Sequence, residues 1–524
     1  MLKECTIPDG LKRRAQLSGE AIAYLFDGVS YTWQEVDQLS RRIAARLRQW
    51  GIRKGTRVGL LGVNSIEWVL CYYAVLRIGG VAVLLNYSYQ AEELKAGLKD
   101  IQVQYLLVGE AKNGQDYERF LHGRRATLPD LNDWERMSRF IDWRGKETER
   151  EPTGACPDVP VFEEDVALII FTSGTTASPR GVELMHGQLM EAMGSVVQRM
   201  GWTKEDRLVL PLPLYHGSGA NCGLLVALHA GMSAVLLRTF RSIEVMEAIQ
   251  KYRCTVFNAV PAMPLLMMAN ARFGEFDLSS LRSGILSGAV ISEETYRKIR
   301  EGFRMKNFLP AYGMTETTTL NTLTKPNTPD EERWTNAGGV LPGMEVRIWH
   351  CREERVQPSG EVGEIQVRGR CIAKGYYGKE SLFQERILEG GWFRTGDVGF
   401  LDTRGRLHFQ SRLSELIVRG GENIVPGEIE AVLEKYSSDI ETVKVVGIPD
   451  PIMQEELVAL ICMKSGRLDP TALRAYLLKN LASFKVPRYF FQVAHFAMTG
   501  SGKIDLKKAR ETAERYASEK GDER

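Results

Sequence analysis

The feature that most constrains the fold is an alternation of helical patterns with short apolar segments, which continues to about residue 310. The segments RVGLLG, QYLLVG, CTVFNAV and SGILSGA are typical of buried strands, and helical patterns separate them. Parallel strands need such crossover helices. The pattern therefore predicts an α/β fold built on parallel sheets.

One helix, glycine and strand unit occurs twice. CYYAVLRIGGVAVLLN ends in AVLL at 82–85, and GLLVALHAGMSAVLLR ends in AVLL at 234–237. Two similar α/β layers in tandem account for the repetition, with a chance match of four letters as the alternative. The longest apolar stretch starts at Trp68 and is interrupted by Arg77 and two glycines, which favours a helix ending at glycine over a membrane span.

The pattern changes twice further along the chain. From about residue 340, short and closely spaced strands predict a β-rich subdomain. Beyond Arg412, two helical patterns, two strands and a charged tail predict a small α+β domain. We therefore expect a large N-terminal α/β domain over residues 1–411 and a small, mobile C-terminal domain over 412–524.

The composition limits the kinds of molecule that this chain is expected to bind. The chain has 524 residues, too many for one core, and a net charge of +2, which argues against nucleic acid or an anionic membrane as a partner. Its eight cysteines form no C-x-x-C pair, and the N-terminus lacks the apolar core of a signal peptide. These features predict a cytoplasmic protein with small-molecule partners. Histidine spacing gives no indication of a zinc site.

The stretch VALIIFTSGTTASPRG predicts a buried strand followed by a loop rich in glycine and hydroxyl residues. Such a loop can hold an anion with backbone N–H groups and hydroxyls, because glycine allows close approach. The glycines at Gly174 and Gly181 do not have the spacing of a Walker loop. Taken alone, the stretch is better explained as an ordinary surface turn.

Five motifs decide between these alternatives. They are TSGTTASPRG at 172–181, AYGMTE at 311–316, GWFRTGDVG at 391–399, GGENIVPGEIE at 420–430 and MTGSGKID at 498–505. In content and order they resemble the motifs of the adenylate-forming superfamily of acyl-CoA synthetases, peptide-synthetase adenylation domains and luciferases. The resemblance extends from about Ser30 to Lys508 and is greatest to a free-standing acyl-CoA ligase.

The resemblance implies a nucleotide site for ATP and Mg²⁺. It places the β- and γ-phosphates against the loop, adenine against an aromatic wall, and the ribose hydroxyls against a carboxylate, which offers two acceptor oxygens. The implied nucleotide-binding residues are Thr172, Ser173, Gly174, Thr175, Thr176, Arg180, Ser287, Gly288, Ala289, Tyr312, Gly313, Asp397 and Arg412. In this set Tyr312 stacks on adenine, Asp397 binds the ribose, and Arg412 reaches the ribose or a phosphate.

The resemblance also implies the catalytic groups. Lys503 bridges the substrate carboxylate and the α-phosphate, where charge develops as pyrophosphate leaves. Thr315 donates to the α-phosphate, and Glu316 coordinates Mg²⁺, a hard cation that suits carboxylate oxygen. His216 is expected to gate the acyl pocket, and a packed histidine is the alternative.

For the second half-reaction the resemblance implies rotation of the small domain, after which Gly420 and Gly421 line the path of the coenzyme A thiol. Ser414 stands where the superfamily usually has Asp or Lys at the hinge. The energetics of hinge rotation in the superfamily therefore cannot be assumed for this chain. Ala177 and Arg180 replace a glycine and a lysine of the phosphate loop. Neither change removes a group that the chemistry needs.

The pocket walls are expected to be mostly apolar, with a few polar edges. This composition suits a fatty or aryl carboxylic acid. The expected wall residues are Val260, Met263, Ile285 and Leu286, with Asn258, Thr317, Thr318 and Thr319 at the edges. No aspartate is placed to hold a substrate ammonium group, which argues against an amino acid.

The sequence thus predicts an ATP-dependent acid–CoA ligase that forms acyl-AMP, releases pyrophosphate and transfers the acyl group to coenzyme A. The main alternative is an adenylating enzyme that loads a carrier protein. Oxidative luciferase-type chemistry and a ligand-binding relic remain as further alternatives, although the charged residues of the motifs disfavour a relic. A homodimer is left open.

Overall fold

The computed structural model describes residues 2, 6–112, 117, 121, 128, 130–140, 159–172, 180–288, 293–350, 353–419, 422–450, 452–498 and 504–521. The chain divides into two compact units. The N-terminal unit comprises Met1–Val346 and Val367–Phe393, and the C-terminal unit comprises Arg347–Gln366 and Arg394–Arg524.

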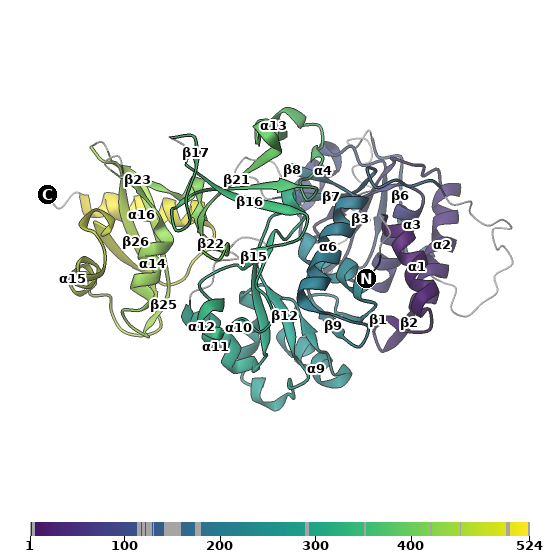
Figure 1. Cartoon of the computed structure of the whole chain (residues 1–524), viewed down its shortest axis with the longest axis horizontal. Helices are drawn as coiled ribbons and strands as arrows, with labels where there is room; N and C mark the ends of the chain where they lie inside the picture. The colour runs from purple at the N-terminus through teal and green to yellow at the C-terminus, as the bar shows by residue number, and fades with distance from the viewer. Residues whose placement is uncertain are drawn as a thin grey trace. The chain divides into compact units, whose positions relative to one another are not determined.

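The first large sheet of the N-terminal unit has seven strands in the order β19-β8-β7-β4-β3-β5-β6. Strands β8, β7, β3 and β6 are labelled in Figure 1. Strands β6, β5, β3, β4 and β7 are parallel, whereas β8 and β19 add to one edge in antiparallel fashion. The antiparallel edge arises because the chain turns back directly after β7, at the predicted phosphate loop. The bounds are β3 (Arg57–Leu61), β4 (Val81–Leu85), β5 (Tyr105–Val108), β6 (Asp133–Arg136), β7 (Val166–Thr172), β8 (Arg180–Met185) and β19 (Gly375–Tyr376).

The second large sheet has nine strands in the order β15-β14-β13-β12-β11-β9-β10-β1-β2. Its six central strands are parallel, and β2, β14 and β15 pair antiparallel at the ends. The bounds are β1 (Ile22–Phe26), β2 (Val29–Thr32), β9 (Arg207–Leu210), β10 (Ser233–Leu236), β11 (Val256–Phe257), β12 (Ser283–Leu286), β13 (Asn307–Tyr312), β14 (Thr322–Leu323) and β15 (Gly339–Val340).

The repeated AVLL segments are confirmed as strands β4 and β10, which lie in different sheets. Each follows a helix that ends at a glycine with positive φ, Gly79 at 69° and Gly231 at 74°. That region of backbone conformation favours glycine, so the helix can stop there and the strand can start two residues after the glycine. The prediction of two similar α/β layers is therefore confirmed.

The core of the N-terminal unit lies on both faces of the seven-stranded sheet. On β4, Ala82 and Leu84 belong to one cluster of buried side chains, and Val83 and Leu85 belong to another. Helix α3 (Ile66–Arg77) is buried along nearly its whole length, as an apolar helix in the interior should be. It packs beside α1 and α2 (Figure 1). None of the helices in the described ranges is long and apolar enough to cross a membrane.

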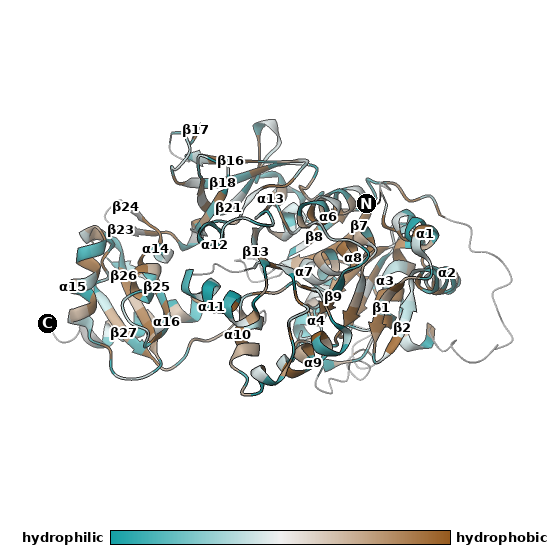
Figure 2. Ribbon diagram, turned by 60° about the horizontal axis from the view of Figure 1, so that its bottom comes forward, coloured by the Kyte–Doolittle hydropathy of each residue, from teal (hydrophilic) through white to brown (hydrophobic). Residues whose placement is uncertain are grey.

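The remaining helices of this unit connect the strands. In Figure 2 strand β1 is mainly hydrophobic, whereas α11 is mostly hydrophilic, in agreement with a buried sheet and a surface helix. The helices are α1 (Ile7–Ser18), α2 (Trp33–Gln49), α4 (Ala91–Asp100), α6 (His186–Met200), α7 (Gly217–Gly219), α8 (Val226–Ala230), α9 (Ser242–Tyr252), α10 (Ala262–Met268), α11 (Glu293–Phe303), α12 (Asp330–Arg333) and α13 (Glu380–Gln384).

The predicted β-rich subdomain is a six-stranded sheet with the order β17-β16-β18-β21-β20 and β22 paired to β21. The division into two units cuts through its strands β16, β18 and β21. The bounds are β16 (Met344–His350), β17 (Arg355–Val356), β18 (Gly363–Gly369), β20 (Ile387–Leu388), β21 (Trp392–Leu401) and β22 (Leu407–Arg412).

The rest of the C-terminal unit is a five-stranded sheet with helices on both faces. Side chains alternate along β26, so Leu457 and Ala459 join the cluster that contains α14 and α15, and Val458 and Leu460 join the cluster that contains α16. The bounds are β23 (Ile417–Arg419), β24 (Glu422–Ile424), β25 (Ile440–Asp450), β26 (Gln454–Met463), β27 (Tyr489–Val493), α14 (Pro426–Glu434), α15 (Pro470–Asn480) and α16 (Leu506–Gly521).

The predicted fold class is confirmed, with two differences in the small domain. The sequence predicts two strands there, whereas the sheet has five. The charged tail is helix α16, because Ala509, Ala513 and Ala517 recur every four residues and are buried against the sheet. The boundary at residues 411/412 was placed where a mobile domain is expected to begin. It stays a prediction.

Candidate active site

The predicted phosphate loop is bracketed by two paired strands. Thr172 ends β7, Arg180 begins β8, and the two residues are register partners in the antiparallel ladder. The predicted phosphate-binding residues between them, Ser173, Gly174, Thr175 and Thr176, lie outside the described residues. The described ladder therefore brings the two ends of the loop together, with a cation at one end.

Arg180 lies against Tyr376 of the neighbouring strand β19. Its guanidinium carbon is 5.2 Å from the centre of the Tyr376 ring. The contact follows from the strand pairing, since Tyr376 is the register partner of Val182, two residues along β8 from Arg180. Tyr376 is fully buried, and the Phe383 ring packs against it edge-on with centroids 5.1 Å apart.

Glu316, the predicted magnesium ligand, lies in this same group of residues. It belongs to a short 3-10 turn (Thr315–Thr317) that follows β13, and only 6% of its surface is exposed. The Tyr376 hydroxyl donates to Glu316 Oε1 at 2.9 Å. Arg386 Nη1 donates to the Tyr376 oxygen at 2.9 Å and lies 3.7 Å from Glu316 Oε1. The cluster thus joins a buried carboxylate, a phenol and two guanidinium groups.

The protonation state of the phenol fixes the direction of the hydrogen bond. Burial raises the pKa of Tyr376, and the neighbouring negative charge of Glu316 raises it further. The hydroxyl is therefore protonated at neutral pH and donates its proton to the carboxylate.

The threonines that follow Glu316 are bonded within the protein. Thr318 and Thr319 have positive φ angles of 59° and 79°, a costly conformation for a β-branched residue. The Thr318 hydroxyl donates to the Cys371 carbonyl at 2.5 Å and accepts from Gln188 Nε2 at 2.7 Å. Thr319 accepts from Asn221 at 2.8 Å. These hydroxyls hold the turn in place, and their expected position at the edge of the substrate pocket stays a prediction.

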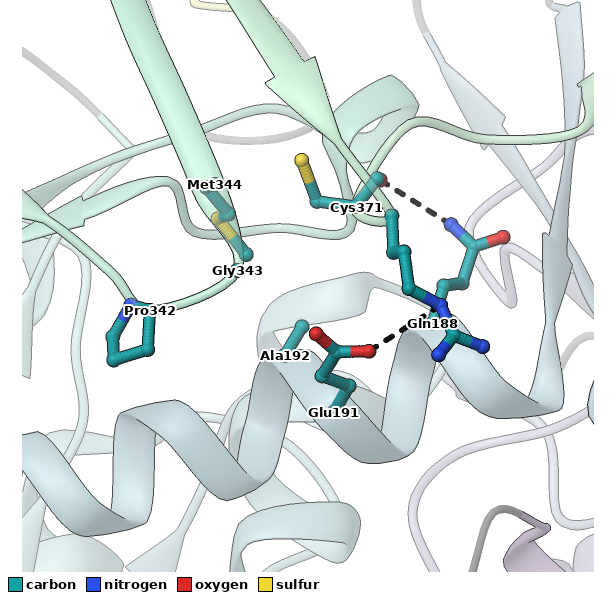
Figure 3. A pocket seen from close by; sticks show the side chains of 8 residues that line it. Gln188, Glu191, Ala192, Pro342, Gly343, Met344 and Cys371 are labelled. Atoms are coloured by element: carbon teal, nitrogen blue, oxygen red, sulfur yellow. Dashed lines mark hydrogen bonds and ion pairs between the residues drawn. The ribbon is translucent and has the colours of Figure 1, made fainter.

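Figure 3 shows the Gln188 amide directed at the Cys371 carbonyl beside a small cavity. Side chains of α6 and of the chain around Gly343 and Arg370 line the cavity. Its volume is about 10 Å³, enough for a single water at most. This space is therefore part of the packing around the Glu316 turn and cannot hold a substrate.

The predicted adenine site lies at the ends of two neighbouring parallel strands. Leu286 of β12 pairs with Pro310 of β13, so Ser287 and Tyr312 extend from the same edge of the sheet. Tyr312 is 8% exposed. A Cβ on Gly313 would come within 2.2 Å of the Thr319 carbonyl, so this position requires glycine. Gly288 has a φ of 93°, and Ala289 lies outside the described residues.

His216, predicted to gate the acyl pocket, precedes α7 and a π-helical turn (Ala220–Leu225). Its ring centre is 4.4 Å from that of Tyr215, which in turn packs edge-on against Tyr87. π-helical turns often occur at functional sites. Of the other expected wall residues, Asn258 is buried and bonds the Cys222 carbonyl at 2.8 Å.

The C-terminal unit brings together the predicted ribose carboxylate and the predicted arginine. Asp397 of β21 and Arg412 of β22 are register partners, and Arg412 Nε lies 3.5 Å from Asp397 Oδ1. Asp397 is 4% exposed, whereas the Arg412 side chain is 48% exposed. The backbone N–H of Asp397 donates to the Thr395 hydroxyl at 3.0 Å.

Three further predicted residues of the C-terminal unit, Gly420, Gly421 and Lys503, lie outside the described residues, as does the Ser414 side chain. The described strands place Gly420 and Gly421 in sequence between the paired residues Arg419 and Glu422. Their predicted roles therefore stay predictions.

Sequence reasoning missed Tyr376, Arg386 and Gln188. Tyr376 stands in KGYYGK, where an aromatic pair between glycines is the only signal, and it does not distinguish Tyr376 from Tyr377. Arg386 and Gln188 stand in none of the five motifs.

The fold, a large α/β domain followed by a small C-terminal domain, is that of adenylate-forming enzymes. The model of the AMP-binding enzyme family matches residues 11–377, and the model of the AMP-binding enzyme C-terminal domain matches residues 428–503. The chain belongs to the AMP-binding enzyme family.

Individual relatives agree with this assignment. The chain is 31% identical over 523 residues to YngI of Bacillus subtilis, which is named an acyl-CoA synthetase, with 94% of each chain covered. It is 30% identical over 523 residues to the mitochondrial medium-chain acyl-CoA ligase ACSF2 of Danio rerio, covering 95% of this chain and 86% of the relative. The predicted enzyme class, an acid–thiol ligase, is confirmed.

A solved structure is also similar over most of the chain. The o-succinylbenzoate CoA synthetase MenE from Bacillus subtilis, in complex with its acyl-adenylate, matches with a TM-score of 0.81 and 28% identity, covering 95% of this chain and 96% of MenE. The same synthetase has been solved with ATP and a magnesium ion. The predicted ATP, Mg²⁺ and coenzyme A agree with these relatives.

Proposed function

We propose that this protein is an ATP-dependent acid–CoA ligase that activates a fatty or aryl carboxylic acid. The observation that carries the proposal is the buried Glu316 carboxylate, which one phenol connects to Arg180 at the end of the phosphate loop. A fixed carboxylate and a cation next to a phosphate loop provide the charges that adenylate transfer requires.

In the first half-reaction the substrate carboxylate attacks the α-phosphorus of ATP in line with the bond to pyrophosphate. That bond breaks, an acyl–phosphate anhydride forms, and the electron pair leaves with pyrophosphate. Arg180 and the loop residues 172–176 bind the departing phosphates, and Thr315 donates to the α-phosphate. Lys503 stabilises charge shared by the attacking carboxylate and the α-phosphate.

The Glu316 carboxylate fits Mg²⁺ as a hard oxygen ligand. When bound, Mg²⁺ neutralises charge on the phosphate oxygens. Tyr312 and the chain at Ser287–Gly288 hold adenine, and Asp397 accepts from the ribose hydroxyls with Arg412 beside it.

In the second half-reaction the coenzyme A thiolate attacks the acyl carbon, the acyl–phosphate bond breaks, and AMP leaves. We expect residues 412–524 to move between the two steps, which brings Gly420 and Gly421 to the thiol path and withdraws Lys503. His216 lies at the entrance of the acyl pocket in this scheme.

The similarity to a medium-chain acyl-CoA ligase over nearly the whole chain favours an aliphatic acid, and the similarity to MenE keeps an aryl acid in consideration. The test incubates purified protein with ATP, Mg²⁺, coenzyme A and either an aliphatic or an aryl acid pool, and detects products by mass spectrometry. We expect a CoA thioester from one pool. Acyl-AMP without thioester would favour the carrier-protein alternative, and absence of both would contradict the proposal.

A further inference from the structure

Tyr376 contacts both halves of the proposed magnesium and phosphate site without belonging to any of the five motifs. Its hydroxyl donates to Glu316 Oε1, and its ring faces the Arg180 guanidinium. The ring is fully buried and fixed by Phe383 and by the pairing of β19 with β8. The phenol therefore has little freedom to turn away from the carboxylate.

Arg386 determines which way the phenol proton points. A guanidinium group can only donate, and Arg386 donates to the Tyr376 oxygen at 2.9 Å. The acceptor side of the phenol is thereby occupied, so its proton is directed to Glu316. Donation from a cation also polarises the O–H bond and makes it a stronger donor.

This hydrogen bond orients the two oxygens of the carboxylate. Among the described residues, Glu316 has two side-chain partners, Tyr376 and Arg386. Both contact its Oε1 atom. The backbone of Glu316 is fixed as well, because its carbonyl accepts from the Ala373 N–H at 2.8 Å. With Oε1 and the main chain held, the direction of Oε2 is set before a metal arrives.

The segment that carries Tyr376 also bonds to strand β8, which follows the phosphate loop. The Tyr377 N–H donates to the Gly181 carbonyl at 2.9 Å, one residue beyond Arg180. The segment from Ala373 to Tyr377 therefore connects the turn that carries Glu316 with the strand that leaves the loop.

The geometry points to Tyr376 as a positioning residue that holds the Glu316 carboxylate for Mg²⁺·ATP and links it to Arg180. This inference rests on the proposed function, in which Glu316 is the metal ligand. Tyr376 itself touches neither metal nor nucleotide in this scheme. Its removal should weaken the metal-dependent part of ATP binding and spare the metal-independent part.

The experiment measures ATP affinity by isothermal titration calorimetry, with no acid or coenzyme A present, once in Mg²⁺ and once in EDTA. The ratio of the two affinities reports how strongly the protein uses the metal, and a uniform structural loss leaves it unchanged. The variants are Tyr376→Phe, which removes one hydroxyl and keeps the ring, and the matched control Tyr377→Phe, whose hydroxyl bonds Gln102.

We expect Tyr376→Phe to lower the affinity ratio about tenfold, as the loss of a partner of a metal ligand does, and Tyr377→Phe to leave it unchanged. An unchanged ratio in Tyr376→Phe would overturn the inference. So would an equal fall of the ratio in Tyr377→Phe.

Glu316→Gln separates the two levels of the proposal. If it leaves the ratio unchanged, the assignment of Glu316 to the metal fails and the inference fails with it. If Glu316→Gln lowers the ratio but Tyr376→Phe does not, only the inference fails. When both hold, adding Tyr376→Phe to Glu316→Gln should cause no further fall, since the hydroxyl acts through that carboxylate.

Discussion

Glu316 of the N-terminal unit and Asp397 of the C-terminal unit are both buried carboxylates with an arginine nearby, but the arginines reach them by different routes. Asp397 faces Arg412 across one ladder of a two-strand hairpin, and half of that arginine is exposed. Glu316 is bonded by a fully buried phenol that lies 60 residues away in the sequence, with Arg386 behind it.

The difference shows that one carboxylate is positioned locally and the other by tertiary packing. A ladder partner follows from strand register, and a half-exposed ion pair contributes little to stability. A hydrogen bond between buried groups depends on every element that places them, and it is stronger in a low-dielectric surrounding. Glu316 should therefore be sensitive to changes at a distance, whereas Asp397 should respond mainly to changes in itself.

The largest expected effect tests a second residue of the C-terminal unit, Lys503, which has a proposed role in adenylate formation. Lys503→Ala should reduce adenylate formation by about 10³-fold, because it removes the cation that follows charge onto the α-phosphate. Thioester formation from supplied acyl-AMP should be largely retained, since only the first step uses this charge. Pyrophosphate release and thioester formation are measured separately.

Lys507→Ala, four residues along the chain, is the control for loss of a positive charge in the same segment. If Lys503→Ala slowed both half-reactions equally, Lys503 would not act in adenylate formation alone.

The next effect concerns Glu316. Glu316→Gln should lower the rate of adenylate formation by about 10²-fold and raise the Mg²⁺ concentration needed for half-maximal rate, because a neutral amide is a poorer ligand for a hard cation. Initial rates across a magnesium titration check this. Glu345→Gln is the matched control, since Glu345 pairs with Arg368 on the surface of the same unit. A magnesium profile identical to wild type would remove Glu316 from the metal site.

A smaller effect is expected at Asp397. Asp397→Asn should raise the KM for ATP about tenfold with a modest change in kcat, because an amide offers one acceptor oxygen to the ribose hydroxyls where a carboxylate offers two. Steady-state kinetics with ATP as the varied substrate measures both constants. Asp402→Asn, which loses a pairing with Arg406 in the turn between β21 and β22, should leave the KM unchanged. A KM that rises equally in both variants would mean that the effect is structural.

The same contrast explains how much of the molecule the sequence could predict. The parallel sheets, the glycine-terminated helices and the order of the motifs are local patterns, and the structure and the family comparisons agree with them. The proximity of Asp397 to Arg412 follows from a hairpin whose strands were both predicted.

The Tyr376 contact with Glu316 was not predictable, because it requires the register of β19 on β8 and the placement of the turn after β13. No local pattern encodes either. The buried face of α16 was not predicted for another reason. Its three alanines stand among charged residues, a composition that is also typical of a solvated tail. The positive φ angles of Thr318 and Thr319, which turn their hydroxyls to partners within the protein, also leave no trace in composition.

The smallest effect tests whether the packing that positions Glu316 also makes its unit sensitive to acid. Two imidazoles are buried among the described residues of the N-terminal unit, and burial lowers the pKa of His186 to about 3 and of His229 to about 4. Both are neutral in the folded protein. Their ordinary pKa is 6.5, so the unfolded chain takes up protons as the pH falls below that value, and stability is lost from about pH 6.5 downward.

At about pH 5.5 each imidazole should lower the free energy of unfolding by about 1.4 kcal/mol relative to neutral pH. The Tm difference between about pH 7.5 and about pH 5.5, measured by calorimetry, should shrink in His229→Gln, which removes one titrating group. His350→Gln, a change at a less buried histidine, serves as the control. If His229→Gln kept the whole difference, the acid sensitivity would have to come from other groups, and the buried interior around α8 would not be its source.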